Sequence, residues 1–79
     1  MAPNGFDTIS NFMHFLGYDS FSLNKEMEIF TCRNTGRKIV VTYNYRAVEF
    51  AAENGITATI QAKYSYNIRE IEIALAELE

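Results

Sequence analysis

Strict alternation of apolar and polar residues marks the stretch at residues 56–66, which reads ITATIQAKYSY. A period of two is typical of a strand that buries one face and exposes the other. The apolar positions are Ile56, Ala58, Ile60, Ala62, Tyr64 and Tyr66. We therefore predict a strand whose last two tyrosines continue its buried face and whose other face is polar.

Two more strands are indicated by runs of strand-like composition at residues 26–32 (EMEIFTC) and 38–45 (KIVVTYNY). The loop between them contains Asn34 and Gly36, which favour a turn, so the two runs form a predicted hairpin. In the second run Val40 is an apolar exception on the face that is otherwise polar. The predicted core face of that run carries Ile39, Val41, Tyr43 and Tyr45.

Apolar residues at spacings of three and four predict a first helix at residues 7–16, with Asp7 as its cap. Residues 46–54 are interpreted as a short second helix, because the pair Asn54-Gly55 is a usual left-handed helix stop. The second helix would connect the hairpin to the alternating strand.

A final helix is predicted to begin at Asn67. Glu70 stands three residues after Asn67, the spacing of a capping box in which each residue accepts a hydrogen bond from the other's backbone. The residues predicted to face the core are Ile68, Ile71, Leu75 and Leu78.

The predicted order of elements is therefore α-β-β-α-β-α, with residues 18–25 as a connection. Two strands joined by a helix usually run parallel with a right-handed crossover. This order predicts an α+β fold, namely a two-layer sandwich in which a three-stranded mixed sheet carries its helices on one face. We expect residues 1–79 to form a single small domain, with residues 1–6 as a flexible leader.

Composition limits the classes of function. The chain has 79 residues, 48% of them hydrophobic, and a formal net charge of −3. That balance favours a folded domain and gives the whole molecule no general attraction to nucleic acid or anionic membranes. A single cysteine and the lack of a signal-like or membrane-spanning segment favour a cytoplasmic location, and we expect no membrane partner.

Catalytic chemistry has few candidates. Cys32 is the only thiol and His14 the only imidazole, and thiolate catalysis would need the two within hydrogen-bond reach. One histidine and one cysteine also fall short of the ligands that a zinc site uses. No glycine-rich phosphate loop is present. We therefore expect no enzyme activity, no metal and no cofactor.

The final helix offers the preferred candidate for a protein contact. Ile73 falls on the side away from the predicted core, near Glu70, Glu72 and Glu77. An apolar residue with an acidic rim fits a basic surface on another protein, or a second copy of the chain in a homodimer. The predicted function is a non-catalytic protein-binding module, a small adaptor or inhibitor of the kind that phages encode, acting through this acidic helical surface.

The alternative is a domain that binds RNA or single-stranded nucleic acid. The hairpin loop contains three basic residues within six positions, Arg33, Arg37 and Lys38, which would contact phosphates. Tyr43 and Tyr64 near the strand ends would then stack on bases. Because the same alternation assigns these tyrosines to the core face, nucleic acid is the less favoured partner.

Overall fold

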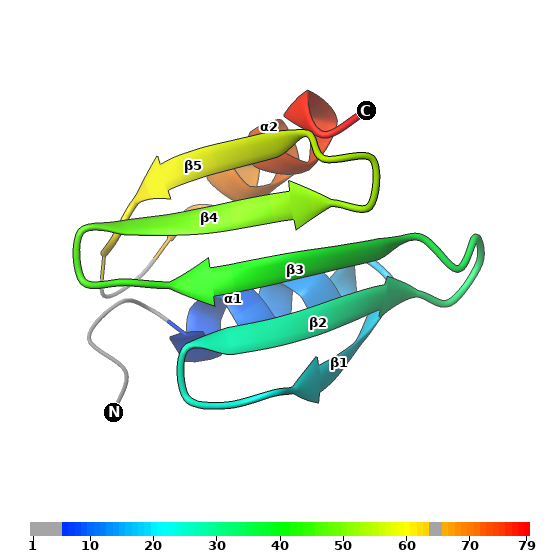
Figure 1. Cartoon of the computed structure of the whole chain (residues 1–79), viewed down its shortest axis with the longest axis horizontal. Coiled ribbons are helices and arrows are strands. Elements are labelled where there is room, and N and C mark those ends of the chain that lie inside the picture. Colours follow the sequence, from blue (N-terminus) through cyan, green and yellow to red (C-terminus); the bar gives the residue numbers. More distant parts are fainter. Residues whose placement is uncertain (1–5, 64–65) are drawn as a thin grey trace.

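The computed structural model describes residues 6–63 and 66–79. Its strands form one antiparallel five-stranded sheet in the order β1-β2-β3-β4-β5, so each strand pairs with the next one in the sequence. Both helices lie behind the sheet in Figure 1, α1 behind β2 and β3 and α2 behind β4 and β5. The elements in chain order are α1 (Phe6–Phe15), β1 (Tyr18–Ser22), β2 (Met27–Cys32), β3 (Lys38–Tyr43), β4 (Ala47–Ala52), β5 (Thr57–Gln61) and α2 (Ile68–Glu77).

The domain is α+β, but the predicted three-stranded mixed sheet and the order α-β-β-α-β-α are wrong. Residues 18–25, predicted as a connection, contain β1, and residues 46–54, predicted as a helix, contain β4. Because β4 replaces the helix that was predicted between β3 and β5, there is no crossover, and short turns between successive strands produce antiparallel pairs.

The error at β4 has a physical cause. The strand reads AVEFAA, and alanine and glutamate are good helix formers. Val48 and Phe50 nevertheless alternate with Glu49, and both are fully buried against the core while Glu49 is exposed. Pairing with β3 and β5 on both sides therefore outweighs the local helix preference.

The pair Asn54-Gly55 forms the turn between β4 and β5 instead of ending a helix. Gly55 has a φ of 91°, in the left-handed region that glycine adopts at little cost, and its N–H donates to the Ala52 carbonyl at 3.1 Å. The Asn54 side chain accepts a hydrogen bond from the Ile56 N–H at 3.0 Å. Ile56 is consequently exposed at the turn and does not extend the core face of β5.

The core lies between the sheet and the two helices. Alternate residues of β2 to β5 point toward the helices, which confirms the period-two pattern within β2, β3 and β5. The strand predicted at residues 56–66 is too long, since β5 spans only Thr57–Gln61. α1 begins at Phe6, so Asp7 lies inside the helix, and the other residues of the predicted leader fall outside the described residues. The largest fully buried side chains are Phe30, Phe50, Ile9, Met13, Ile39, Ile71, Leu78, Val41 and Val48.

The predicted start of the last helix is confirmed. The Asn67 side chain accepts a hydrogen bond from the Arg69 N–H at 2.8 Å, and the Asn67 N–H donates to the Glu70 carboxylate at 3.0 Å. The Asn67 side chain also accepts a hydrogen bond from the Glu70 backbone N–H, and this bond together with the one from the Asn67 N–H to Glu70 makes the capping box that the sequence predicts. Ile71 and Leu78 lie in the core, as expected from their spacing.

The tyrosines divide into two groups. Tyr43 and Tyr66 are buried, in agreement with their predicted core positions. Tyr45 is 89% exposed, so its predicted place in the core is wrong, because β3 ends at Tyr43 and Tyr45 lies in the turn to β4. Tyr64 lies outside the described residues.

Candidate binding surface

The face of the sheet away from the helices carries a row of apolar side chains. The strand register aligns Phe21 with Ile29, Ile29 with Val40, and Val40 with Ala51. These four residues, from β1 to β4, alternate with the core residues and therefore point to the face toward the viewer in Figure 1. We call Phe21, Ile29, Val40 and Ala51 the apolar row.

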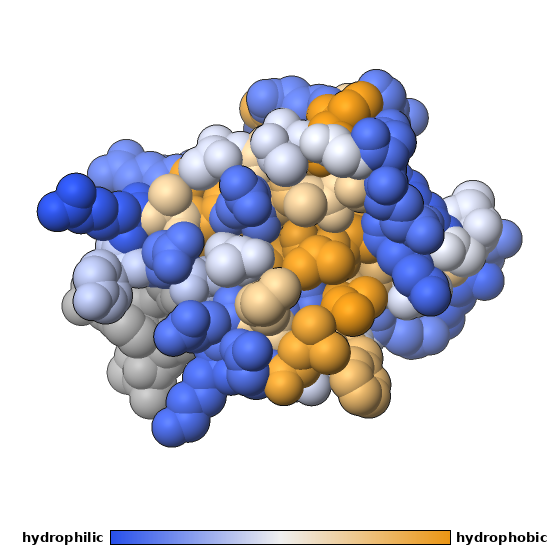
Figure 2. Space-filling model, in the orientation of Figure 1, coloured by the Kyte–Doolittle hydropathy of each residue, from blue (hydrophilic) through white to orange (hydrophobic). Residues whose placement is uncertain are grey.

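The members of the apolar row differ in exposure. Phe21 is 67% exposed, and Ile29 and Val40 are half-buried by their neighbours on the sheet. Leu23, 50% exposed, pairs with Met27 and extends the apolar area along the strands. Figure 2 shows this region as a continuous hydrophobic patch across the middle of the open face, bordered by hydrophilic residues. Contiguous exposed apolar side chains are typical of an interaction surface, whereas single ones are ordinary.

Opposite charges lie on the two sides of the apolar row. Lys38 is in the row toward the β2–β3 turn, paired with Thr31, and is exposed. Glu49 is in the row on the other side, aligned with Thr42 and also exposed. Asp19 pairs with Thr31 in the same row as Lys38 and is also exposed. The open face therefore has an apolar centre, a lysine and an aspartate on one side and a glutamate on the other.

Sequence reasoning expected this face to be polar and missed the row. The polar expectation fits the residues of β5, such as Thr57 and Thr59, which are exposed. Residues 18–25 were interpreted as a connection that Phe21 and Leu23 attach to the core, which is wrong, because both side chains are exposed on the open face. Val40 was the available signal, since it is apolar at a position where the alternation predicts a polar residue.

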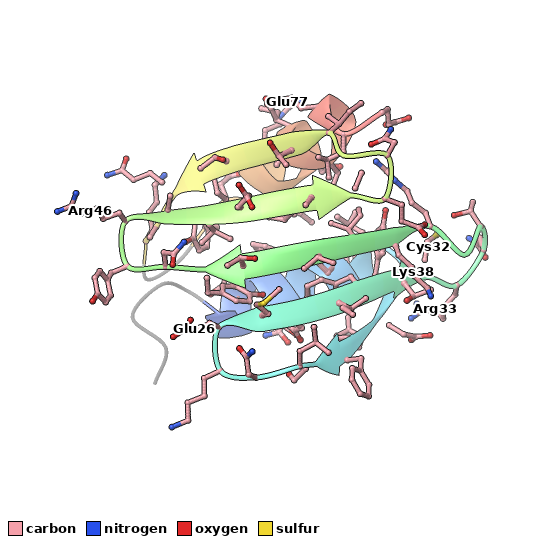
Figure 3. The ribbon with its side chains drawn as sticks, in the orientation of Figure 1. Glu26, Cys32, Arg33, Lys38, Arg46 and Glu77 are labelled. Carbon is pink, nitrogen blue, oxygen red and sulfur yellow. The ribbon has the colours of Figure 1, made fainter. Side chains whose placement is uncertain are left out.

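The predicted acidic surface on α2 is partly engaged within the molecule. Glu70 forms a 2.6 Å ion pair with Lys63, and the hydrogen bond from that lysine holds the pKa of the carboxyl below its ordinary value. Glu72 and Glu77 are exposed, and Ile73 between them is 55% exposed. α2 thus presents one large apolar side chain among acids, and Glu77 lies at its C-terminal end (Figure 3).

Of the residues proposed for nucleic-acid binding, those that the structure describes are not gathered into one site, and Tyr64 is not among them. Arg33 and Lys38 lie together at the β2–β3 end of the sheet (Figure 3), where Arg33 forms a 2.9 Å ion pair with Asp19. Arg37 donates to the Leu75 carbonyl at 3.5 Å. Tyr43 is at the opposite end of β3 and is buried, so it offers no ring face to a base.

A buried carboxylate lies on the helix side of the sheet. Glu28 is only 3% exposed, and it accepts hydrogen bonds from the Tyr43 hydroxyl at 2.9 Å and from the Ser10 hydroxyl at 3.3 Å. Burial, and then the charge of Glu28, raises the pKa of Tyr43 well above its ordinary value. The signal for this site was the alternation that gives Glu28 the same face as Phe30.

Cys32 and His14 have different neighbours. Cys32 lines an open hollow of about 520 Å³ that also contains Thr35 and Arg37. A hydrogen bond with the Thr35 side chain, followed by bonds with the backbone of the turn, lowers the pKa of the thiol. His14 instead lies 3.2 Å from the Ser20 hydroxyl. Within residues 6–63 and 66–79, no three potential metal ligands of the His, Cys, Asp and Glu types gather.

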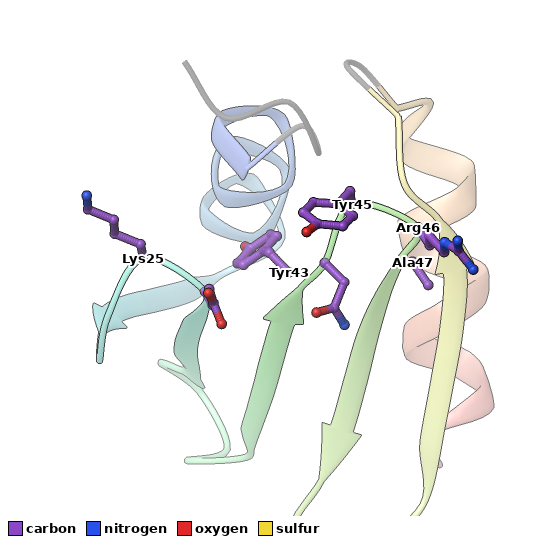
Figure 4. A pocket seen from close by; sticks show the side chains of 7 residues that line it. Lys25, Tyr43, Tyr45, Arg46 and Ala47 are labelled. Atoms are coloured by element: carbon purple, nitrogen blue, oxygen red, sulfur yellow. The ribbon is translucent and has the colours of Figure 1, made fainter.

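A second hollow, of about 540 Å³, lies at the other end of the sheet (Figure 4). Its lining includes exposed Tyr45 and Arg46 of the β3–β4 turn and exposed Lys25 of the β1–β2 connection. Buried Tyr43 also lines this hollow.

Comparison of the chain with family models, curated proteins and solved structures gives no match. Neither described helix has the length and apolar character that crossing a membrane requires. The candidate site therefore rests on the geometry of the open face.

Proposed function

We propose that the protein is a non-catalytic protein-binding module, a small cytoplasmic adaptor or inhibitor, that binds its partner through the open face of the sheet. The observation that carries this proposal is the apolar row of Phe21, Ile29, Val40 and Ala51 on a face that no described helix covers. Burying apolar surface contributes about 25 cal/mol per Å² to association before its entropic costs. A partner gains more from this face than from scattered apolar residues.

The open face is favoured over the acidic surface of α2 because of its apolar content. α2 offers Ile73 alone between Glu72 and Glu77, and Glu70 is already engaged by Lys63. Interface centres are usually apolar and poor in charge, with polar residues at the rim. The α2 surface stays a prediction and provides the natural comparison in an experiment.

Binding of RNA or single-stranded nucleic acid also stays a prediction, with less support. Arg33 is paired with Asp19, and buried Tyr43 lies far along β3 from Lys38. A basic groove with exposed aromatic rings is the arrangement that such binding uses. The described residues do not form that arrangement at the hairpin.

The proposal is tested by capturing proteins from an extract of the source cells with immobilised wild-type protein and two variants. Val40→Lys places a charge at the centre of the apolar row, and Ile73→Lys makes the same type of change on α2. We expect partners captured by the wild type to be retained by Ile73→Lys and reduced at least about tenfold by Val40→Lys. Equal capture by Val40→Lys, with loss in Ile73→Lys, would assign binding to α2 and contradict the proposal.

A further inference from the structure

We propose that the partner of the open face is a second copy of this chain, packed face to face about a twofold axis that follows the apolar row. The inference rests on the proposed binding face and adds the identity of the partner. Two sheets packed in this way lie about 10 Å apart, with their inner side chains filling the space between them. In this arrangement Val40 faces Val40 of the second copy, and Ile29 faces its own counterpart.

Charge complementarity supports a second copy as the occupant. A twofold axis along the apolar row places the row that contains Lys38 opposite the row of the second copy that contains Thr42 and Glu49. Lys38 of one chain therefore faces Thr42 of the other. Glu49 lies beside Thr42 on the next strand, about 4.8 Å away, within reach of the long lysine side chain. By symmetry the contact between Lys38 and Glu49 occurs twice, as an isologous interface requires.

The same charges oppose the other face-to-face arrangement. A twofold axis parallel to the strands through β3 would place Lys38 against Lys38 of the second copy and Phe21 of β1 against Thr57 of β5. Like charges in contact and an apolar ring against a polar edge are both unfavourable. The surface therefore selects the axis that runs across the strands.

The size of the face sets the expected affinity. Five strands at about 4.8 Å and five to six residues at about 3.3 Å give a face of roughly 19 by 18 Å. Its area in the plane of the sheet, about 340 Å², is less than half of the about 800 Å² per partner that a standard interface buries. The dimer is thus of the small, reversible class, with a dissociation constant on the order of 10 μM. A chain of 79 residues, which hides little of its surface alone, gains from this burial.

Sedimentation equilibrium of the purified full chain, from about 1 μM to about 500 μM, spans the expected dissociation constant. We expect a monomer at the lowest concentration and a dimer at the highest for the wild type and for Ile73→Lys. Val40→Lys should raise the dissociation constant at least about tenfold. A wild type that stays monomeric throughout, or a Val40→Lys variant that dimerises as the wild type does, overturns the proposal.

Exchanging the charges of Lys38 and Glu49 tests the proposed twofold axis, because both residues are exposed and lie outside the core. Lys38→Glu and Glu49→Lys should each raise the dissociation constant roughly fivefold, and the double variant should return it to within about twofold of the wild type. Additive losses in the double variant would contradict the contact between Lys38 and Glu49. Circular dichroism of every variant confirms that folding is retained.

The outcomes for the dimer and for the proposed function are distinguishable. If the wild type is monomeric but Val40→Lys still abolishes capture of another protein, the dimer is overturned and the binding function stands. If the wild type dimerises through Val40 and the charge exchange succeeds, the dimer stands. Capture of other proteins that is unchanged in Val40→Lys would then count against the use of the open face for a foreign partner.

Discussion

At the scale of single residues, the contact between Glu28 and Tyr43 is the part of the core most sensitive to a small chemical change. A buried carboxylate needs hydrogen-bond donors. Among the described residues Glu28 accepts from the hydroxyls of Tyr43 and Ser10, and Tyr43 is the closer. Removing a donor leaves the charge under-solvated in the core, which usually costs more than the bond itself contributes.

Tyr43→Phe should therefore lower the free energy of unfolding by about 1–3 kcal/mol, measured by urea denaturation at neutral pH. Tyr45→Phe is the matched control, because that ring is exposed at the neighbouring turn. The control should stay within about 0.5 kcal/mol of the wild type. Equal effects of the two variants would show that the hydroxyl of Tyr43 does not stabilise the core.

The thiol of Cys32 gives a second prediction at this scale. Because the thiolate is the reactive form and the pKa is lowered, the rate of alkylation by iodoacetamide should reach half its maximum at a lower pH than for an unstructured cysteine peptide. Thr35→Ala removes the side-chain hydrogen bond that is the largest cause of the shift. The pH profile of the variant should move upward, and an unchanged profile would refute the role of Thr35.

At the scale of elements, the start of α2 is held by Asn67, Glu70 and Lys63. Asn67→Ala removes the cap and should cost about 1 kcal/mol of stability. Since the pKa of Glu70 is lowered in the folded protein, its carboxylate stabilises the fold above the ordinary value of 4.5. That contribution is lost as the pH falls from there through the lowered pKa.

Thermal unfolding measured across this acidic range tests the linkage. The wild type should lose stability more steeply than Glu70→Gln, which has no carboxylate to protonate at that position. The comparison uses the same buffers and protein concentration, because association also shifts the unfolding temperature. Parallel curves for the two proteins would show that Glu70 does not contribute to the pH dependence.

The elements differ in how far sequence predicted them. The capping box and the core alternation of β2, β3 and β5 depend on short spacings, and both were found. β4 was not predicted, because its alanines and glutamate favour a helix locally. It becomes a strand only by pairing with β3 and β5. β1 is an edge strand with one partner and mostly exposed residues, so its sequence carries little burial signal.

At the scale of the whole molecule, the apolar row exists only once the register is known. Its four members come from four strands, and each alone is an unremarkable apolar residue in the chain. Val40 was visible as an exception, yet its neighbours Ile29 and Ala51 are distant in sequence. The helical candidate Ile73 was found because it depends on a spacing within one element, and it is indeed exposed.

The order of the strands in the sheet also has a kinetic consequence. Since β1 to β5 pair strictly with their sequence neighbours, each step of assembly closes a loop of only a few residues. Low contact order of this kind is associated with fast folding for a β-rich domain. The contact between α1 and α2 joins the two ends of the chain and therefore closes the longest loop, whereas α1 also packs on neighbouring β1 and α2 on neighbouring β5 across short connections.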